Sequence, residues 1–260
     1  NPLYRQRIID GLQDIPSISL TTDRSNLYGS TGIFDNYGLS GIDGERPASV
    51  ELIDPKGGAE FDIFAGLRIR GAVGRSAPKK SLRLFFNSTY DGNLAFPLFG
   101  DEGAELFTKV DLRAEQNNSW SSNVDAPWQN TFIREVFSRD TQRDMGELYT
   151  RSRYYHLYIN GTYWGLYQSQ ERGEADFASS YLGGSPKEWD ALKSSSSRII
   201  ELKDGTRDAY TEFYEYAKAG FTGQNEPNYW KVLGLNPDGT RNPAYPILLD
   251  QENLIHYILT

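Results

Sequence analysis

The stretch that decides the fold is residues 153–171, which reads RYYHLYINGTYWGLYQSQE. Two segments rich in aromatic and β-branched residues flank Asn160-Gly161, a pair that favours the positive φ angles of a type I′ turn. Arg153–Ile159 and Thr162–Glu171 are therefore predicted to form a β-hairpin. Alternation along the second strand predicts one face made of Tyr163, Gly165, Tyr167, Ser169 and Glu171.

Further strands are predicted before this hairpin, and helices on both sides of it. Apolar runs bounded by Gly, Pro, Asp and Asn predict strands near residues 48–54, 61–71, 80–87 and 106–113. Apolar residues at helical spacing predict helices near residues 127–145, 174–182, 208–219, 229–233 and 251–260. The fold class is therefore predicted to be α+β, a single domain over residues 1–260 with a sheet-rich half at 15–125 and a half at 126–260 that holds helices and the hairpin.

Composition excludes several classes of function. The chain has 260 residues, 35 of them acidic and 27 basic, and a formal net charge of -8, so its surface repels phosphate backbones and nucleic acid is not expected as a partner. It has no cysteine and two histidines, which excludes thiolate chemistry and the usual Cys/His zinc sites. No apolar run is long enough to span a bilayer. The many Tyr, Asn, Ser and Gly residues favour an extracytoplasmic or secreted location.

A second hairpin, rich in basic residues, is predicted at residues 68–83, which read RIRGAVGRSAPKKSLR. Its glycine-bearing turn carries basic residues on both flanks, an arrangement that suits phosphate groups because backbone N–H groups and cationic side chains both attract them. The segment is not a P-loop, since Lys79 stands where GxxxxGK[ST] requires glycine and no helix is predicted to follow.

Strand parity separates the two lysines of this hairpin. Lys80 shares a face with Leu82, Leu84 and Phe86, whereas Lys79 shares the other face with Ser81 and Arg83. A lysine on an apolar face either extends its ammonium group to the rim of the sheet or reaches a buried anionic ligand. The residues alone leave both interpretations open.

Other catalytic arrangements have weaker support. No GxSxG segment accompanies His156 or His256, so a Ser-His-Asp triad is not indicated. A pair of carboxylates for glycoside hydrolysis cannot be picked out among 35 acidic residues without coordinates. Glu171, at the end of the aromatic strand, is a candidate partner for a lysine, although an ion pair at the rim of a sheet contributes little to stability.

Several blocks in order resemble the CotH kinase family, which is named after spore coat protein H. The most specific are the Arg68–Arg83 block and the segment from Leu157 to Arg172; weaker blocks lie at residues 45–51, 96–100, 112–113 and 134–146. The resemblance covers roughly residues 15–260 and implies a divergent protein-kinase-like fold.

This resemblance also implies an activity, which is transfer of the γ-phosphoryl group of ATP, with Mg²⁺, to serines of a protein substrate. Carried over to this sequence, it makes Glu171 the catalytic candidate that pairs with a lysine. The nucleotide-binding candidates are Lys80, Lys79, Arg70, Arg75 and Arg83. Many relatives have Ser or Thr where this chain has Gly74, which counts against nucleotide affinity.

The resemblance further implies that the family's metal-binding and catalytic acids follow the segment that ends at Thr260, so no metal ligand is assigned here. On this basis we expect the chain to be C-terminally incomplete, inactive by itself and prone to pair with a second fragment or an identical copy. The expected contact surface is an apolar patch of residues 251–260 with Tyr163 and Tyr167. The alternative function is a non-catalytic cell-surface or carbohydrate-binding module, which the abundant Tyr and Trp favour.

Overall fold

A computed structural model describes residues 2–114, 131–194 and 200–260. The chain forms two compact units. The first comprises Asn1–Phe137 and Thr150–Arg172, and the second comprises Ser138–Tyr149 and Gly173–Thr260. The predicted hairpin therefore belongs to the strand-rich first unit, together with the strands of residues 15–125.

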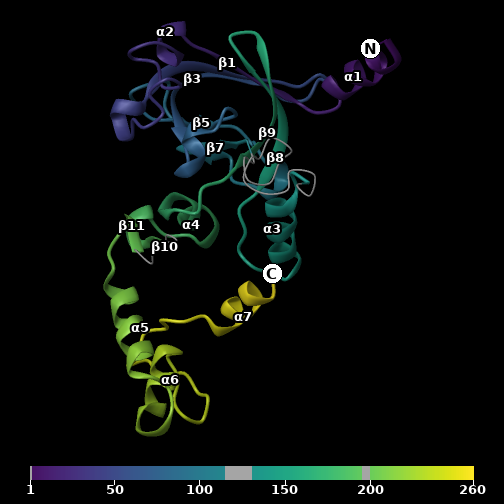
Figure 1. The fold of residues 1–260 in the computed structure, drawn as a ribbon. Helices are drawn as coiled ribbons and strands as arrows, with labels where there is room; N and C mark the ends of the chain where they lie inside the picture. Colours follow the sequence, from purple (N-terminus) through teal and green to yellow (C-terminus); the bar gives the residue numbers. More distant parts are fainter. Residues whose placement is uncertain (1, 115–130, 195–199) are drawn as a thin grey trace. The chain divides into compact units, whose positions relative to one another are not determined.

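Seven strands of the first unit close into a barrel in the order β1-β2-β3-β4-β7-β9-β8 (Figure 1). Neighbouring strands are antiparallel except β1 and β8, which run parallel and complete the closure. The strands are β1 (Ser17–Thr21), β2 (Arg46–Ile53), β3 (Phe61–Arg70), β4 (Ser81–Phe85), β7 (Lys109–Arg113), β8 (Ser152–Ile159) and β9 (Thr162–Gln170).

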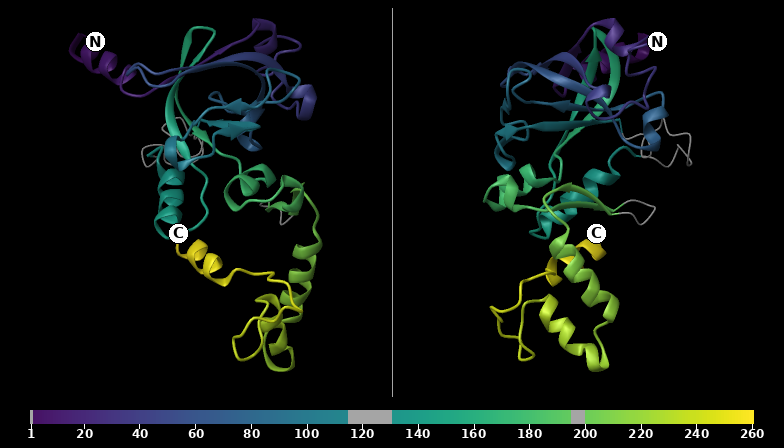
Figure 2. Two further views of the ribbon diagram at one scale, coloured as in Figure 1. Left: turned by 180° about the vertical axis from the view of Figure 1, so that it is seen from behind. Right: turned by 90° about the vertical axis from the view of Figure 1, so that its left-hand side faces the viewer.

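The barrel interior is filled by apolar side chains, one from every second residue of each strand. Figure 2 shows the strands curving around this interior. Because successive side chains of a strand point to opposite faces, each strand gives its apolar half to the core and its polar half to the outer surface. The most deeply buried members include Leu20, Val50, Leu67, Leu82, Leu112 and Leu157.

The turn of the β8–β9 hairpin confirms the prediction from Asn160-Gly161. Asn160 has φ 49° and Gly161 has φ 74°, so both central residues adopt the left-handed conformation of a type I′ turn. The face prediction is only partly correct, because the register shifts between Leu157 and Tyr158, which pair with Gly165 and Tyr163. Trp164 is the extra residue of this bulge. The bulge places Tyr163 on the outer surface, half exposed, while Tyr167 is fully buried.

Shorter elements fill the connections of the first unit. A two-stranded sheet pairs β5 with β6. The other short elements are helical, and all of them except α1 are single turns of three or four residues. These elements are η1 (Pro2–Tyr4), α1 (Arg5–Leu12), α2 (Arg24–Leu27), η2 (Gly41–Gly44), η3 (Val73–Ser76), β5 (Leu94–Ala95), η4 (Gly100–Glu102) and β6 (Leu106–Phe107).

Helices predominate in the second unit. Helix α3 (Arg134–Asp144) leads into it from the first unit, and a two-stranded sheet pairs β10 with β11. Helices α5 and α6 lie side by side in each view (Figures 1 and 2). The remaining elements are α4 (Ala175–Leu182), η6 (Pro186–Glu188), β10 (Ala191–Ser194), β11 (Ile200–Asp204), α5 (Asp208–Ala219), η7 (Gly223–Asn225), α6 (Glu226–Val232) and α7 (Gln251–Leu259).

The α+β class is confirmed, and the sheet-rich content is greater than expected. A closed seven-stranded barrel is not the usual sheet of a protein kinase, so the prediction of a kinase-like fold needs this correction. The sequence analysis missed β1, which closes the barrel, and the β10–β11 pair. Residues 127–130 of the predicted helix lie outside the described residues.

Candidate functional site

The candidate site is the β3–β4 hairpin and the strands beside it, where the predicted nucleotide-binding residues lie. Arg75, in the turn, donates from Nε to the carbonyl of Tyr37 at 2.7 Å and from Nη1 to the carbonyl of Ile69 at 2.6 Å. Its Nη2 donates to the carbonyl of Leu39. The planar guanidinium thus connects the turn to the loop before β2, because three separate carbonyls accept from one rigid group.

Lys80 is buried at the base of the same turn, 7% exposed, on the face that parity predicted. Its ammonium group donates to the carbonyls of Arg75 at 2.8 Å and Ala77 at 3.1 Å, and lies 4.8 Å from the ring centre of Tyr37. Burial lowers the pKa of Lys80, and the nearby charge of Arg75 lowers it further. The sequence left a rim position and a buried anion as the alternatives; in the structure, backbone carbonyls of the turn surround the ammonium group.

Arg70 and Arg83 lie on the outer surface of the barrel and share one carboxylate. Asp111 of β7 is only 1% exposed; its Oδ1 accepts from Arg83 Nε at 2.5 Å and its Oδ2 accepts from Arg83 Nη2 at 3.0 Å. Arg70 Nε lies 2.7 Å from Oδ2 of the same carboxylate. The register explains this cluster, since Arg83 is directly opposite Asp111 across the β4–β7 ladder.

This outer surface carries a cluster of arginine–carboxylate ion pairs. Within the described residues, Arg68 pairs with Glu45, Arg70 and Arg83 both pair with Asp111, and Arg113 pairs with Glu135. The pKa of Arg70 is lowered mainly by burial; Asp111 opposes this, while Arg113, Arg83 and Arg172 add to it. A polyanion would relieve the repulsion among these guanidinium groups, and guanidinium binds phosphate oxygens through two parallel hydrogen bonds.

Lys79 lies away from Lys80, as parity predicted. Its ammonium group donates to the carbonyl of Leu166 at 2.6 Å and lies 4.7 Å from the ring centre of Tyr167. Gly165, beside this contact, has φ 120°, a backbone conformation that side chains rarely adopt, whereas a Cβ there would only come into ordinary contact with Lys79. The glycine of the aromatic strand is therefore required by its backbone conformation.

Glu171 is buried, 4% exposed, directly after β9. Its carboxylate accepts from the backbone N–H of Arg151 at 2.8 Å and forms an ion pair with the Arg151 side chain at 3.4 Å. The sequence analysis made Glu171 a candidate partner for a lysine of the basic hairpin, with Lys80 the first candidate for that lysine. Both hairpins do belong to the same barrel, but β7 lies between them, and the contacts described above give each residue a different partner.

Sequence reasoning missed Asp111 and a second cluster on the outer surface. Glu45 accepts from Tyr90 at 2.8 Å and from Arg68 Nε at 2.6 Å. Burial and the hydrogen bond to Glu45 raise the pKa of Tyr90 to about 12. The sequence shows a charged residue, Asp111, between Val110 and Leu112 of a predicted strand. It does not show that Asp111 pairs with arginines, because those arginines lie on other strands.

The described residues hold no group of three carboxylate, histidine or cysteine side chains placed to bind a metal ion. Within the same residues, no helix is long and apolar enough to cross a membrane. The apolar side chains of α7 are exposed as predicted, among them Tyr257, Ile258 and Leu259, but Tyr167 is buried and cannot belong to such a patch.

The barrel and its basic hairpin define an α+β protein with several arginines on the outer surface of its barrel. The sequence model of one protein family, described as CotH kinase protein, matches residues 67–257. The chain therefore belongs to the CotH kinase family, as the basic and aromatic hairpins had indicated. This family is kinase-like, which suggests a transferase that acts on a protein. No curated protein matched the chain.

Proposed function

We propose that this chain carries the nucleotide-binding part of an ATP-dependent protein serine kinase that works outside the cytoplasm. The observation that carries the proposal is that Arg70 and Arg83 share the carboxylate of Asp111, within the segment that matches the CotH kinase family. Arg70 and Arg83 are placed to exchange part of their interaction with Asp111 for phosphate oxygens, since both groups present a planar pair of acceptors.

Within this proposal the other basic residues have supporting roles. Arg75 holds the turn between β3 and β4 in place through three carbonyls, and Lys80 holds its base. The N–H groups of Arg75 and Ala77 donate to the carbonyls of Ala72 and Gly74 inside the turn, so the turn is held in one shape, which lowers the entropic cost of binding a phosphate beside it. Glu171 orients Arg151.

The described residues hold no group of three carboxylate, histidine or cysteine side chains that could hold Mg²⁺ without a nucleotide. No step through a metal is therefore assigned to these residues. Within the described residues, we assign charge compensation of the triphosphate to the arginines of the outer surface.

Nucleotide binding by the chain tests the first half of the proposal. Displacement of a fluorescent ATP analogue by ATP should give saturable binding that weakens about tenfold in Arg70→Gln and in Arg83→Gln, because each variant removes a bidentate partner of phosphate. Arg24→Gln, which removes an exposed arginine of the first unit, is the matched control and should bind as the unaltered chain does. Equal affinity in all variants would remove the outer surface from the nucleotide site.

Phosphoryl transfer tests the second half. The full-length protein should transfer label from γ-labelled ATP to serine-rich proteins, and acid hydrolysis of the product should release phosphoserine. Lack of transfer to several such substrates, together with binding of glycans, would favour the alternative of a non-catalytic surface module.

A further inference from the structure

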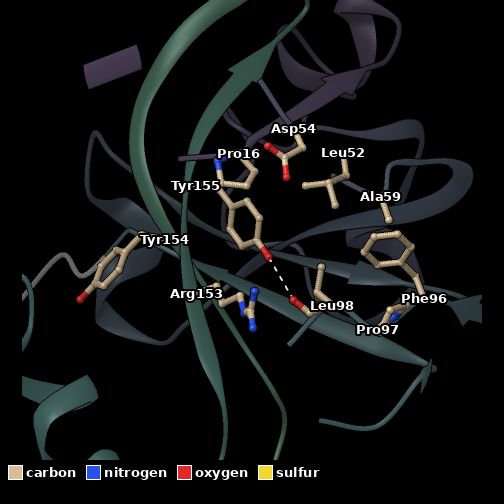
Figure 3. A pocket seen from close by; sticks show the side chains of 10 residues that line it. All are labelled: Pro16, Leu52, Asp54, Ala59, Phe96, Pro97, Leu98, Arg153, Tyr154 and Tyr155. Carbon is tan, nitrogen blue, oxygen red and sulfur yellow. Dashed lines mark hydrogen bonds between the residues drawn. The ribbon is translucent and has the colours of Figure 1, made fainter. Parts of the chain in front are cut away.

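The barrel has a pocket that none of the predicted nucleotide-binding residues lines. It has a volume of about 200 Å³ and opens beside the start of β1 and the end of β2 (Figure 3). Drug-sized ligands occupy roughly 300–1,000 Å³, so this pocket suits a smaller molecule. Its apolar lining includes Pro16, Leu52, Phe96, Leu98 and Tyr155.

Two opposite charges line the pocket without forming an ion pair with one another. Figure 3 shows the carboxylate of Asp54 beside Pro16 and the guanidinium of Arg153 near the hydroxyl of Tyr155, with the Tyr155 ring between them. Because the two charged groups are held apart, each is available to a ligand that brings the opposite charge.

Both groups retain free hydrogen-bonding capacity. Arg153 Nη2 donates to the carbonyl of Phe99 at 2.7 Å, which fixes the side chain, while Nε and Nη1 have no partner among the described residues. Asp54 Oδ1 accepts from the backbone N–H of Lys56 at 2.8 Å, while Oδ2 accepts no hydrogen bond from the described part of the chain. Each side chain is thus oriented by one bond and has atoms left to bind a ligand.

The apolar lining is rigid between these charges. The hydroxyl of Tyr155 donates to the carbonyl of Leu98 at 3.3 Å, and the rings of Phe61 and Phe96 pack edge to face with their centres 4.9 Å apart. The Tyr154 side chain points away from the pocket, where its hydroxyl donates to the carbonyl of Phe132 at 2.7 Å. The pocket therefore presents a preformed apolar surface with one cation and one anion at its edges.

We propose that this pocket binds a small zwitterion, a free α-amino acid with an apolar side chain of about the size of leucine. The ligand carboxylate binds the Nε and Nη1 groups of Arg153, its ammonium group binds Oδ2 of Asp54, and its side chain packs against Tyr155 and Leu98. Charge complementarity selects the zwitterion, and the volume limits the side chain. This inference is independent of the proposed kinase function.

The test uses calorimetric titration of the full chain with L-leucine and two derivatives that each lack one charge. L-leucine should bind with a Kd in the micromolar to millimolar range. L-leucinamide, which lacks the carboxylate, and N-acetyl-L-leucine, which lacks the ammonium group, should each bind about tenfold more weakly or worse.

Variants assign each charge to its partner. Arg153→Gln should weaken the binding of L-leucine about tenfold, and this variant should no longer bind L-leucine more tightly than L-leucinamide. Asp54→Asn should no longer bind L-leucine more tightly than N-acetyl-L-leucine. Arg153→Lys keeps the charge and should retain part of the preference, which separates charge recognition from a folding defect. Arg24→Gln and Asp23→Asn change exposed charges outside the pocket and should bind as the unaltered chain does.

Four outcomes would overturn the proposal. They are no saturable binding up to the order of 10 millimolar, equal affinity for L-leucine and both derivatives, equal affinity of the pocket and control variants, and binding only of peptides whose termini are blocked. The last outcome would make the pocket a peptide site.

Discussion

Two basic regions of the barrel use their cations differently. In the β3–β4 turn, Arg75 and Lys80 donate hydrogen bonds to backbone carbonyls, which belong to the fold itself. On the outer surface, Arg70 and Arg83 form ion pairs with the same carboxylate, that of Asp111. A carbonyl cannot leave without unfolding the turn, whereas a carboxylate can share its arginines with another anion. If the proposed function holds, the turn should keep its hydrogen bonds when an anionic ligand binds, and Arg70 and Arg83 should exchange part of their contact with Asp111 for that ligand.

The largest expected effect comes from removing the shared carboxylate. Asp111→Asn removes the carboxylate that two partly buried arginines share and should lower the free energy of unfolding by about 3 kcal/mol. Denaturant unfolding measures this change. Asp62→Asn, on an exposed carboxylate that accepts from Ser49, is the control and should cost less than about 0.5 kcal/mol. A cost as small as that of the control would mean that the arginines are fully hydrated.

A smaller loss in the free energy of unfolding is expected from a substitution in the β3–β4 turn. Arg75→Lys replaces a planar fork by a point charge that cannot reach three carbonyls, so it should cost about 2 kcal/mol in the same experiment. The loop at residues 36–40 should also become a site of limited proteolysis, since two of those carbonyls lie in it. Arg24→Lys is the matched control, and unchanged proteolysis in Arg75→Lys would contradict the structural role of the turn.

Lys80→Met should have a still smaller effect, about 1 kcal/mol, because methionine fills the buried volume while two carbonyls lose a donor. The lowered pKa of Lys80 adds a pH dependence. The unfolded chain holds this proton more tightly, so the unaltered protein gains stability relative to Lys80→Met as pH rises from the lowered pKa toward 10.5. Lys56→Met removes an exposed ion pair with Asp14 and should show neither effect. If the free energies of unfolding of the unaltered protein and of Lys80→Met changed with pH in parallel, the lowered pKa of Lys80 would be refuted.

The smallest effect concerns Tyr90 on the outer surface. Tyr90→Phe should cost about 0.5 kcal/mol at neutral pH, since Glu45 keeps its bonds to Arg68. Because the folded pKa of Tyr90 is raised to about 12, the unaltered protein should lose stability relative to the variant as pH rises from 10 to 12. Difference titration of tyrosinate absorbance between the two proteins checks the pKa, and a group that titrates near 10 would show that Glu45 does not hold the phenol.

Strand positions and faces were largely predictable because they depend on short-range patterns. Alternation placed Lys80 inward with Leu82 and Leu84, and the structure confirms this. The family was predictable as well, since the two hairpins carry distinctive residues in a fixed order. The barrel was not, because β1 shows only the polar–apolar alternation of a short strand, and its pairing with β2 on one side and β8 on the other is decided by the fold.

The sequence by itself determined the turn at Asn160-Gly161, since a type I′ turn depends on the φ preferences of two adjacent residues. The tertiary structure alone decided that Trp164 is the extra residue of a bulge, which moved Tyr163 out of the core, and that Arg83 lies opposite Asp111. The physical reason is that ladder register joins strands far apart in the chain. A shift of one residue reverses every side chain beyond it, and no local pattern records that shift.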